Sequence, residues 1–412
     1  MTDDRSTIEF DHHTPDYHEH AREIYADLRA RCPVGWSESY GGFWVMSSYD
    51  AVWSALRDHE TFSSGKWTEA DGTWRGGDVI PDTPSPPLLP LDTDPPLWNG
   101  LRRILNPWLG PAQVEARQEL FDSYAERLLD DVIEKGSFDL VLDFANPMPA
   151  MATLNLVGID LDEWQRWAEP HHAIQYAPFG TPEFDAAMAG LGWQRERLAE
   201  LIDDRRRSPR NDLLSAVAQA EIDGSPLSLE DGAALVLTVI GGGVDTTTSV
   251  VANSVIYLGR QLEKRAWLAE DLDARLPGAI EELLRTFPPV LAVARTVRRD
   301  ANIGSEHVCP GERALLSVVS ANHDPAEFDR PEQTVLDRAA NRHVTFGIGI
   351  HRCVGSNAAR AMVKTMLTHV LRRIPDYVVD EARAVRYGPS SAVDGWISLP
   401  VQFSPGSRSS EI

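Results

Sequence analysis

The sequence predicts a mainly α-helical fold with a minor β component, and three patterns support this prediction. Apolar side chains recur with the period of a helix in several segments, among them 123–135, 193–206 and 274–286. Strand-like runs are short, such as 42–47, 313–319 and 397–403. From Leu229 to about residue 258 the chain is apolar enough to form one long buried helix. Helix therefore dominates the expected fold.

The 412 residues contain no linker rich in proline, glycine and serine, no repeat and no low-complexity tract. We therefore expect a single domain over residues 1–412, with 1–20 and 405–412 as peripheral tails. The formal net charge is −23. This charge argues against nucleic acid and against anionic membrane surfaces as partners.

The first residues and the cysteines both point to the cytoplasm. The chain starts without a basic region or an apolar run, so we expect no secretory signal and no membrane anchor. Cys32, Cys309 and Cys353 are scattered, odd in number and without paired metal spacing. A disulfide framework or a zinc site is therefore not expected.

A glycine-rich loop places Cys353 where the chain enters a helix. Residues 346–355 read Phe-Gly-Ile-Gly-Ile-His-Arg-Cys-Val-Gly, and a helical pattern over 356–373 follows. The positive end of that helix and its N–H groups would stabilise a thiolate, so Cys353 can serve as a metal ligand. Three glycines let the backbone approach a flat cofactor closely, namely Gly347, Gly349 and Gly355. The helix should be anchored in the core by a buried stripe of Met362, Val363, Met366, Leu367, Val370 and Leu371.

The pattern Phe-Gly-x-Gly-x-His-x-Cys-x-Gly resembles the haem-binding loop of the cytochrome P450 monooxygenases, in which the cysteine thiolate is the proximal iron ligand. This resemblance implies the P450 fold, a triangular helical domain with small β-sheets and haem between a distal glycine- and threonine-containing helix and the helix after the cysteine. It also implies haem b, iron protoporphyrin IX, held by Cys353 with Phe346, Gly347 and Gly355 of the loop. An isolated cysteine is more often a small buried hydrophobic residue, but the other family motifs, found in the family's order, favour a ligand.

The middle of the long apolar segment reads Gly-Gly-Gly-Val-Asp-Thr-Thr-Thr over 241–248. Each glycine should destabilise a helix interior by roughly 1 kcal/mol, which is tolerated where something must approach the backbone. On local grounds, two helices joined by a glycine-rich turn with Asp245 as an N-cap are an equal alternative. The stretch resembles the family's distal-helix motif, which implies that Gly242 and Gly243 make room for oxygen and substrate. It also implies that Asp245 and Thr246 deliver the protons that dioxygen activation consumes. We expect the glycines to bend the helix and expose carbonyl groups to water.

Two further motifs match the family by position. Glu282 and Arg285 are spaced i and i+3 on a predicted helix, where an ion pair is feasible although such pairs are common on surfaces. Downstream, the Ala-Asn-His-Asp-Pro run at 321–325 leads to Arg338, as in the family's loop before the cysteine. The resemblance implies that Arg338 forms a structural triad with Glu282 and Arg285, which would fix the position of the cysteine loop.

Haem carries two propionates, for which arginine and other strong donors are suitable partners. Three residues match the family's partners by position, namely Arg102, Arg295 and His351. The family commonly has histidine four residues after Asp94, where this chain has Trp98. Its indole N–H group can donate one hydrogen bond but carries no charge. Trp98 and Arg102 are four residues apart, so both can face the haem on a helix.

Two segments are expected to close over a substrate pocket: 65–91, with Trp67 and Trp74, and 170–182, with Tyr176 and Phe179. By resemblance the pocket is completed by Val239, Ile240, Gly242, Gly243, Val290, Leu291, Ala292 and Trp396. This apolar lining predicts a hydrophobic small-molecule substrate, such as a terpenoid, a steroid, a fatty-acid derivative or an aromatic compound. His171 and His172 could anchor a polar group, but surface histidines on the lid are the favoured interpretation.

Taken together, the motifs are similar to those of bacterial-type cytochrome P450 monooxygenases, which oxidise a substrate with O2 and electrons drawn ultimately from NAD(P)H. The length leaves no room for a flavin or iron–sulfur domain, so we expect a separate ferredoxin and its reductase. The ferredoxin should dock near a group of basic residues, namely Arg102, Arg103, Arg352 and Lys364.

Three other functions are weighed against this one. A haem-thiolate peroxygenase or isomerase needs no electron donor, but the intact acid–threonine pair argues against it. A haem-binding sensor or carrier would be excluded by consumption of reduced cofactor in step with product. A cysteine hydrolase built on Cys353 and His351 is disfavoured because the two lie only two residues apart on a glycine loop.

Overall fold

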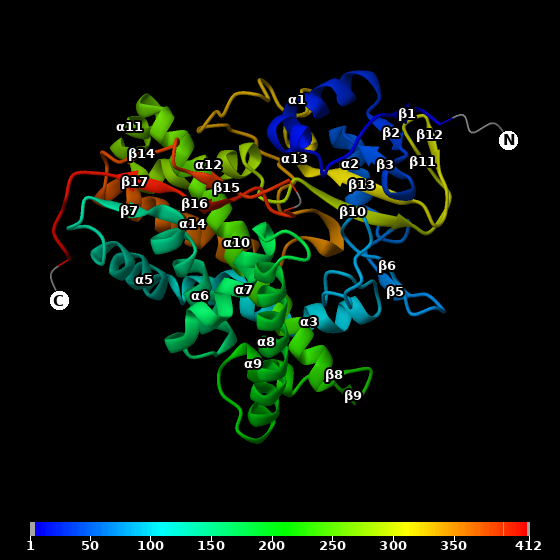
Figure 1. The fold of residues 1–412 in the computed structure, drawn as a ribbon, viewed down its shortest axis with the longest axis horizontal. Coiled ribbons are helices and arrows are strands. Elements are labelled where there is room, and N and C mark those ends of the chain that lie inside the picture. The colour runs from blue at the N-terminus through cyan, green and yellow to red at the C-terminus, as the bar shows by residue number, and fades with distance from the viewer. Residues whose placement is uncertain (1–4, 390, 410–412) are drawn as a thin grey trace. The chain divides into compact units, whose positions relative to one another are not determined.

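The computed structural model describes residues 5–389 and 391–409, and the chain forms two compact units (Figure 1). Unit 1 comprises Met1–Arg102, Val290–Thr334 and Ala340–Cys353. Unit 2 comprises Arg103–Pro289, Val335–Ala339 and Val354–Ile412. Each unit is therefore built from segments that are distant in the sequence.

Unit 1 is organised around a six-stranded mixed sheet with the strand order β1-β2-β3-β13-β10-β4 (Figure 1). Its strands are β1 (Thr7–Ile8), β2 (Val34–Ser37), β3 (Phe43–Met46), β4 (Phe62–Ser63), β10 (Ala292–Val297) and β13 (Arg313–Ser317). β13 pairs in parallel with β3 and antiparallel with β10, which joins early and late parts of the chain. Two hairpins are added, β5 (Lys66–Thr68) with β6 (Trp74–Gly76) and β11 (Ala301–Ile303) with β12 (Glu306–Val308).

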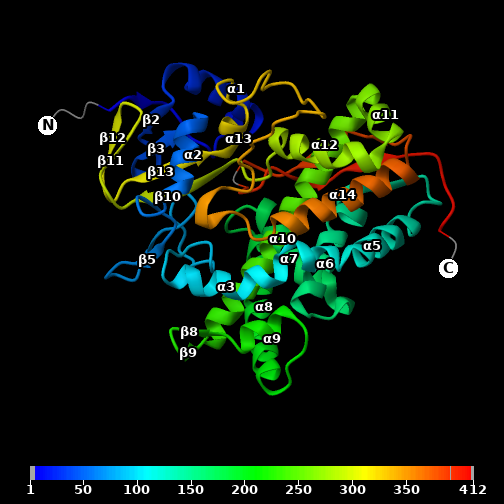
Figure 2. The same ribbon diagram turned by 180° about the vertical axis from the view of Figure 1, so that it is seen from behind.

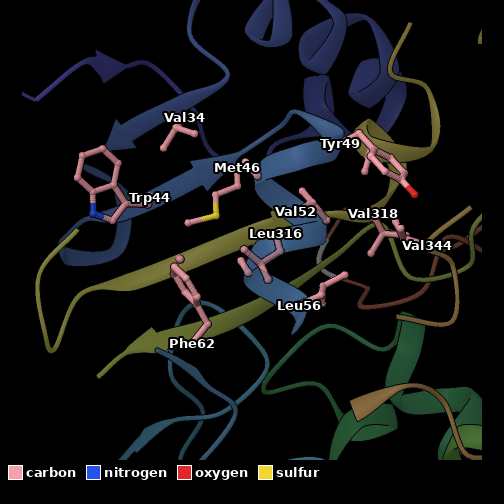
Figure 3. Close-up of a cluster of buried hydrophobic side chains, with 14 of the residues drawn as sticks. Val34, Trp44, Met46, Tyr49, Val52, Leu56, Phe62, Leu316, Val318 and Val344 are labelled. Carbon is pink, nitrogen blue, oxygen red and sulfur yellow. The ribbon is translucent and has the colours of Figure 1, made fainter. Parts of the chain in front are cut away.

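Helices of unit 1 pack on this sheet through their apolar faces. They are α1 (Pro15–Arg31), α2 (Tyr49–Arg57) and α13 (Val318–Asn322), and short 3₁₀ turns lie at Ser39–Gly41 and Gly349–His351. Figure 3 shows Val52 and Leu56 of α2 directed toward Met46 and Leu316 of the sheet, within one buried cluster. Burial of such side chains stabilises the unit by roughly 1.5–3 kcal/mol each relative to exposure.

Both ends of the chain differ from the tails expected over 1–20 and 405–412. β1 pairs with β2, and Phe10 and Tyr17 belong to a buried aromatic cluster of unit 1. In unit 2, the N–H group of Gly406 donates a hydrogen bond to the carbonyl oxygen of Ile133 at 3.0 Å. Residues 1–4 and 410–412 lie outside the described residues. The rest of each end is thus held by packing or by backbone hydrogen bonds.

Unit 2 is mainly helical (Figures 1 and 2). Its helices are α4 (Pro111–Glu115), α5 (Gln118–Asp130), α6 (Pro147–Val157), α7 (Trp164–Tyr176), α8 (Pro182–Arg207), α9 (Leu213–Ala218), α10 (Leu229–Arg260), α11 (Leu262–Glu270), α12 (Leu272–Thr286) and α14 (Ser356–Arg373), with a π-helical turn at Val141–Ala145 and a 3₁₀ turn at Leu161–Glu163. α3 (Leu97–Leu109) begins in unit 1 and ends in unit 2. Small sheets pair β7 (Ser137–Asp139) with β17 (Pro400–Gln402) and β14 (Val378–Val379), β15 (Val385–Arg386) with β16 (Trp396–Ser398), and β8 (Glu221–Ile222) with β9 (Ser225–Pro226).

α10 is one continuous helix of 32 residues, so the alternative of two helices joined at 241–243 is not formed. Ser228 caps its start by accepting a hydrogen bond from the Asp231 N–H group at 2.9 Å, and α6, α7, α8 and α14 pack against it. Within the described residues, α10 alone is long and apolar enough to cross a membrane. However, 61% of its most apolar stretch is buried in the protein, and core helices meet the same criterion. This property therefore assigns no membrane span.

The mainly helical fold class is confirmed, and the helix boundaries agree best where a buried stripe defines them. α14 spans Ser356–Arg373 as predicted, and the six apolar residues of its stripe are buried. The strand expected over 313–319 ends at Ser317 instead. This residue caps α13 by accepting a hydrogen bond from the Ser320 N–H group at 3.1 Å, which turns the chain into a helix.

Candidate active site

The cysteine loop of unit 1, residues 346–353, is closed by its own backbone. The N–H group of Cys353 donates a hydrogen bond to the carbonyl oxygen of Phe346 at 2.8 Å. The N–H group of Gly347 donates to the carbonyl oxygen of Val344, also at 2.8 Å. The Cys353 residue is exposed, and α14 begins three residues later. These local hydrogen bonds therefore fix the backbone of the loop that carries the Cys353 thiol group.

Two glycines make this loop shape possible. Gly347 has a φ of 64° and Gly349 a φ of 70°, in the left-handed region that favours glycine. A Cβ atom on Gly349 would lie 2.7 Å from the carbonyl oxygen of Leu56, which the backbone of α2 cannot easily avoid. Gly355, by contrast, has a φ of −82°, a value that any residue adopts. Backbone conformation thus explains Gly347 and Gly349 but not Gly355.

A cluster of polar side chains in unit 1 adjoins this loop. Arg102 Nη1 donates a hydrogen bond to the carbonyl oxygen of Arg352 at 3.0 Å, and its guanidinium carbon lies 5.5 Å from the centre of the Trp98 ring. Trp98 in turn meets the His351 ring edge-to-face at 5.9 Å. Three buried atoms of this cluster have no hydrogen-bond partner among the described residues, namely Trp98 Nε1, Arg102 Nε and His351 Nε2. Such atoms are costly unless a ligand or water satisfies them.

Charged groups of both signs lie around this cluster. Asp94 accepts hydrogen bonds from the Ser63 hydroxyl group and from the Ser64 N–H group, and its Oδ1 lies 3.9 Å from His351 Nε2, too far for a hydrogen bond. Burial lowers the pKa of His351, and burial also lowers the pKa of Arg295, which is only 4% exposed. Each cationic form is therefore destabilised by lost solvation. A bound anion would stabilise both.

The predicted triad comes together inside unit 2. Glu282 Oε2 accepts from Arg285 Nε at 2.8 Å and from Arg338 Nε at 2.9 Å, and Glu282 Oε1 accepts from the Val335 N–H group at 2.7 Å. The side chains of Glu282 and Arg285 are fully buried. Burial alone would raise the pKa of Glu282, but these hydrogen bonds together hold it below its ordinary value. The carboxylate thus ties α12 to the segment around 335–338.

The three consecutive glycines of α10 have three different surroundings. A Cβ atom on Gly241 would lie 2.8 Å from the His171 ring, and one on Gly243 would lie 2.4 Å from Thr153 Oγ1. These two glycines therefore let α7 and α6 pack closely against α10. A Cβ atom on Gly242 would meet nothing within 4 Å among the described residues. Of the three, only Gly242 borders open space.

Asp245 sits in a buried polar cluster of unit 2. It is 2% exposed, and its Oδ1 lies 2.7 Å from His172 Nδ1 and accepts a hydrogen bond from the Tyr387 hydroxyl group at 2.9 Å. Its Oδ2 is buried without a partner among the described residues. The hydroxyl group of Thr246 donates to the carbonyl oxygen of Gly242 at 2.9 Å, across one helical turn. α10 therefore presents a carboxylate, a hydroxyl group and open space within five residues.

One expectation for the lid segment 170–182 is wrong. α7 occupies the first half of this segment. His171 and His172 are each only 8% exposed and are not surface residues, because both lie on the side of α7 that packs against α8 and α10. His171 Nε2 lies 2.9 Å from Gln194 Oε1 of α8. Phe179 does lie in the loop that follows, and it is 87% exposed.

Tyr387 was missed by sequence reasoning. It follows the short strand β15 and belongs to no motif. Burial, followed by the neighbouring Asp245 carboxylate, raises the pKa of Tyr387 well above its usual range, so its hydroxyl group stays protonated. A Cβ atom on Gly395 would lie 2.5 Å from the Tyr387 ring, so this glycine makes room for it. In the sequence, Gly395 was the one sign of this close packing, and a single glycine in a loop does not indicate a functional site.

The expected pocket residues belong to both units. Unit 1 contains Trp67, Trp74, Val290, Leu291 and Ala292, and unit 2 contains Tyr176, Phe179, Val239, Ile240, Gly242, Gly243 and Trp396. The segment 65–91 is not entirely loop, because it contains the β5–β6 hairpin. In this hairpin Trp67 pairs with Arg75, whereas Trp74 pairs with Thr68. The two tryptophans therefore point to opposite faces.

A separate group in unit 1 has metal-binding side-chain types. The ligand atoms of Asp300, His307 and Cys309 lie within 4.8 Å of one another around the β11–β12 hairpin. Asp300 and His307 are exposed, and His307 already pairs with Asp300 at 3.3 Å. The scattered cysteines gave no hint of this grouping, and exposed groups of this kind are common without an ion.

Comparison with known proteins identifies the family. The profile of the family described as Cytochrome P450 matches residues 194–374. A steroid C26-monooxygenase of Mycobacterium tuberculosis is 30% identical over 389 residues, which cover 93% of this chain and 94% of that protein. The chain belongs to the cytochrome P450 family. Cytochrome P450 130 of the same species is 31% identical over 352 residues, covering 84% of this P450 and 85% of the relative.

A solved structure supports the same conclusion for the fold. The Mycobacterium marinum cytochrome P450 CYP268A2, in complex with pseudoionone, matches with a TM-score of 0.85 and 27% identity, covering 93% of this chain and 95% of that one. This P450 therefore has the P450 fold and is an oxidoreductase of the monooxygenase class, in a family that uses a haem with a cysteine thiolate ligand.

The residues of unit 1 fit such a haem. The loop offers the exposed Cys353 as an iron ligand. The adjoining cluster offers three buried polar atoms without partners, on Trp98, Arg102 and His351, and Arg295 adds a buried cation. These groups are suited to carboxylates, which are the polar groups that a haem carries.

Proposed function

We propose that this P450 inserts one oxygen atom of O2 into a hydrophobic small molecule, with haem b bound through Cys353. The observation that carries the proposal is the set of unpartnered buried atoms on Trp98, Arg102 and His351 beside the cysteine loop. One propionate would supply acceptors for them, and Arg295 would serve the other. Trp98 takes the place of the family's histidine as an uncharged donor.

When bound, the haem supplies the activation of dioxygen, which thiolate ligation favours. The chain's own residues have distinct tasks. In unit 1, the backbone of the loop holds Cys353, with Phe346 and Gly347 against the cofactor. In unit 2, Asp245 relays protons and Thr246 holds an ordered water. The Thr246 hydroxyl group can accept a hydrogen bond from that water while it donates to the Gly242 carbonyl, because a hydroxyl oxygen has two lone pairs.

The proposed substrate class is apolar. Support comes from the largely apolar pocket set named above and from the relatives, one named as a steroid C26-monooxygenase and one solved with pseudoionone. A terpenoid, a steroid, a fatty-acid derivative or an aromatic compound would suit such a lining.

The electrons are proposed to come from NAD(P)H through a ferredoxin reductase and a ferredoxin in the cytoplasm. The chain has a net charge of −23, which would repel an acidic ferredoxin. The ferredoxin must therefore be attracted by a local group of basic residues. The proposed docking residues are Arg102 and Arg352 of unit 1, and Arg103 and Lys364 of unit 2. Reduction should slow as salt rises, since exposed charges are screened within about 10 Å at 0.1 M salt. Reduction rates that do not change with salt would contradict this docking surface.

A labelling experiment tests the proposed function. Apolar compounds are first screened for those that shift the spin state of the purified haem protein. Each is then incubated with ferredoxin, reductase and NADPH under isotopically labelled dioxygen. The proposal predicts a product that carries one labelled oxygen atom and forms in step with NADPH consumption. Spin shifts without any oxidised product would instead indicate a sensor or carrier, and product formed with peroxide alone but not with dioxygen would indicate a peroxygenase.

A further inference from the structure

The cluster around Asp245 supports an inference that rests on the proposed function and goes beyond it. We propose that His172 is the proton donor to Asp245, and that Tyr387 holds the two side chains in register. His172 Nδ1 lies 2.7 Å from Asp245 Oδ1, and the Tyr387 hydroxyl oxygen lies 2.9 Å from each of these atoms. All three residues are at least nine-tenths buried. His172 and Tyr387 act through Asp245 and are therefore positioning residues.

Hydrogen-bond chemistry sets the direction of this network. An ionised carboxylate only accepts, so His172 Nδ1 must carry a hydrogen when it bonds Asp245 Oδ1. Tyr387 donates to the same oxygen. This leaves His172 Nε2 at one end and Asp245 Oδ2 at the other, both buried without a partner among the described residues. A water at Nε2 and a water at Oδ2 would complete a path for protons through the pair.

The proposed step moves one proton and no electrons. A doubly protonated imidazole releases its Nδ1 proton to Asp245 Oδ1. The ring is left neutral with its hydrogen on Nε2, and the carboxylate becomes a carboxyl group that can pass a proton on. Solvent then protonates the ring again. The donor is therefore the cationic ring, and its supply depends on the pH of the solution.

Few other titratable groups surround His172. Tyr387 stays protonated, as described above. On α7 itself, the Tyr176 ring lies 5.5 Å from the His172 ring, and burial raises the pKa of Tyr176, with smaller contributions from Glu169, Asp245 and Glu183. Burial also lowers the pKa of His171, so this neighbour stays neutral more readily than an exposed histidine. His172 is therefore the histidine of this cluster whose ring nitrogen bonds Asp245 directly.

His171 supplies a matched control. It is a histidine of the same helix with the same exposure, 8%, but its Nε2 faces Gln194 of α8 rather than Asp245. Replacement by glutamine keeps a polar side chain of similar length in both cases and removes the titratable ring. His171→Gln and His172→Gln therefore differ mainly in the link to Asp245.

The test uses the holoenzyme in two measurements. In the first, product formed per NADPH consumed is measured against pH for the wild type and for His172→Gln, His171→Gln and Tyr387→Phe. We expect the wild-type ratio to fall as the pH rises, because the proposed donor is the protonated ring. In His172→Gln the ratio should be about tenfold lower at mildly acidic pH and independent of pH. This loss is smaller than the roughly 10²–10⁴-fold effect of a general acid, because water can still supply protons to Asp245. His171→Gln should keep the wild-type profile.

The second measurement needs no turnover. Histidine resonances are followed by NMR against pH in the diamagnetic, carbon monoxide-bound reduced protein. The pH dependence of the His172 signals should change in Asp245→Asn and in Tyr387→Phe but not in His171→Gln. A wild-type pH profile in His172→Gln, or His172 signals that are the same in Asp245→Asn as in the wild type, would overturn the proposal. If the His172 signals respond to Asp245→Asn but the protein forms no product, the result would instead contradict the proposed monooxygenase function.

Discussion

The cysteine loop of unit 1 and the polar centre of α10 in unit 2 are built in opposite ways. In the loop, backbone hydrogen bonds and left-handed glycines fix the shape, and most of the partners lie within ten residues. In α10 the backbone is an ordinary helix, and the chemistry depends on side chains from elsewhere in the chain. Asp245 meets His172, 73 residues earlier, and Tyr387, 142 residues later. One region is therefore specified locally, and the other only by the folded unit.

This difference predicts different responses to substitution. Replacing one side chain should remove a specific function from the loop without unfolding it, because the backbone bonds remain. In unit 2, a change in a buried polar side chain should also leave an unsatisfied partner, and the energetic cost is then larger than the lost interaction. The following predictions test this contrast.

Cys353→Ala should have the largest functional effect. The loop should keep its closed shape, because the hydrogen bond from residue 353 to Phe346 uses the backbone. The reduced carbon monoxide complex should lose any strongly red-shifted Soret band, and the monooxygenase activity should disappear. Cys32→Ala is the control and should behave as the wild type. A thiolate-type spectrum that persists in Cys353→Ala would show that the ligand is another residue.

Glu282→Gln should have the largest effect on stability, about 3–5 kcal/mol, because it removes the negative charge that Arg285 and Arg338 share at this site. Denaturant unfolding measures this loss. Glu200→Gln is the control, since Glu200 forms an exposed ion pair with Arg197 that is worth roughly 0–1 kcal/mol. Equal losses in the two variants would mean that the triad is no more than a surface pair.

The triad also predicts part of the acid sensitivity. The pKa of Glu282 is held below its ordinary value of 4.5, so the triad's contribution is complete above that pH and is lost as the pH falls below it. Wild-type stability should therefore decline in this acidic range, measured by unfolding at a series of pH values. Glu282→Gln should show a smaller decline over the same range.

Thr246→Ala should keep haem binding but uncouple NADPH consumption from product formation, because the hydroxyl group that would hold the water is removed. The ratio of product to NADPH consumed measures this effect. Thr238→Ala is a matched control, since Thr238 also donates to the carbonyl oxygen four residues earlier, at 3.0 Å, on the same helix. Normal coupling in Thr246→Ala would remove this residue from the proton path.

Trp98→Phe should have the smallest effect. It removes one hydrogen-bond donor, worth about 0.5–1.5 kcal/mol, so haem affinity should fall roughly 2- to 10-fold. Haem transfer to an acceptor protein measures this change. Trp267→Phe is the control, because Trp267 also lies against an arginine, Arg275, at 4.6 Å. An unchanged affinity in Trp98→Phe would mean that the indole N–H group does not serve a propionate.

The same contrast explains how much the sequence could predict. The cysteine loop and the Glu282 triad were predicted from short motifs, and the helix over 356–373 from one apolar face. The structure contains this helix and the ion pairs of the triad. The network around Asp245 was not predictable, because its members come from distant parts of the sequence and Tyr387 follows a two-residue strand. Its members meet only through the packing of α7 and the β15 region against α10. The sequence also could not show that buried atoms of Trp98, Arg102 and His351 lack hydrogen-bond partners, because this depends on the packing around the cysteine loop.

The absorption spectrum of the purified protein, reduced under carbon monoxide, tests the central claim most directly. If Cys353 holds the iron of a bound haem as a thiolate, the Soret band of this complex should be strongly shifted to the red. A folded protein that binds haem but lacks this band, or one that binds no haem, would contradict the account.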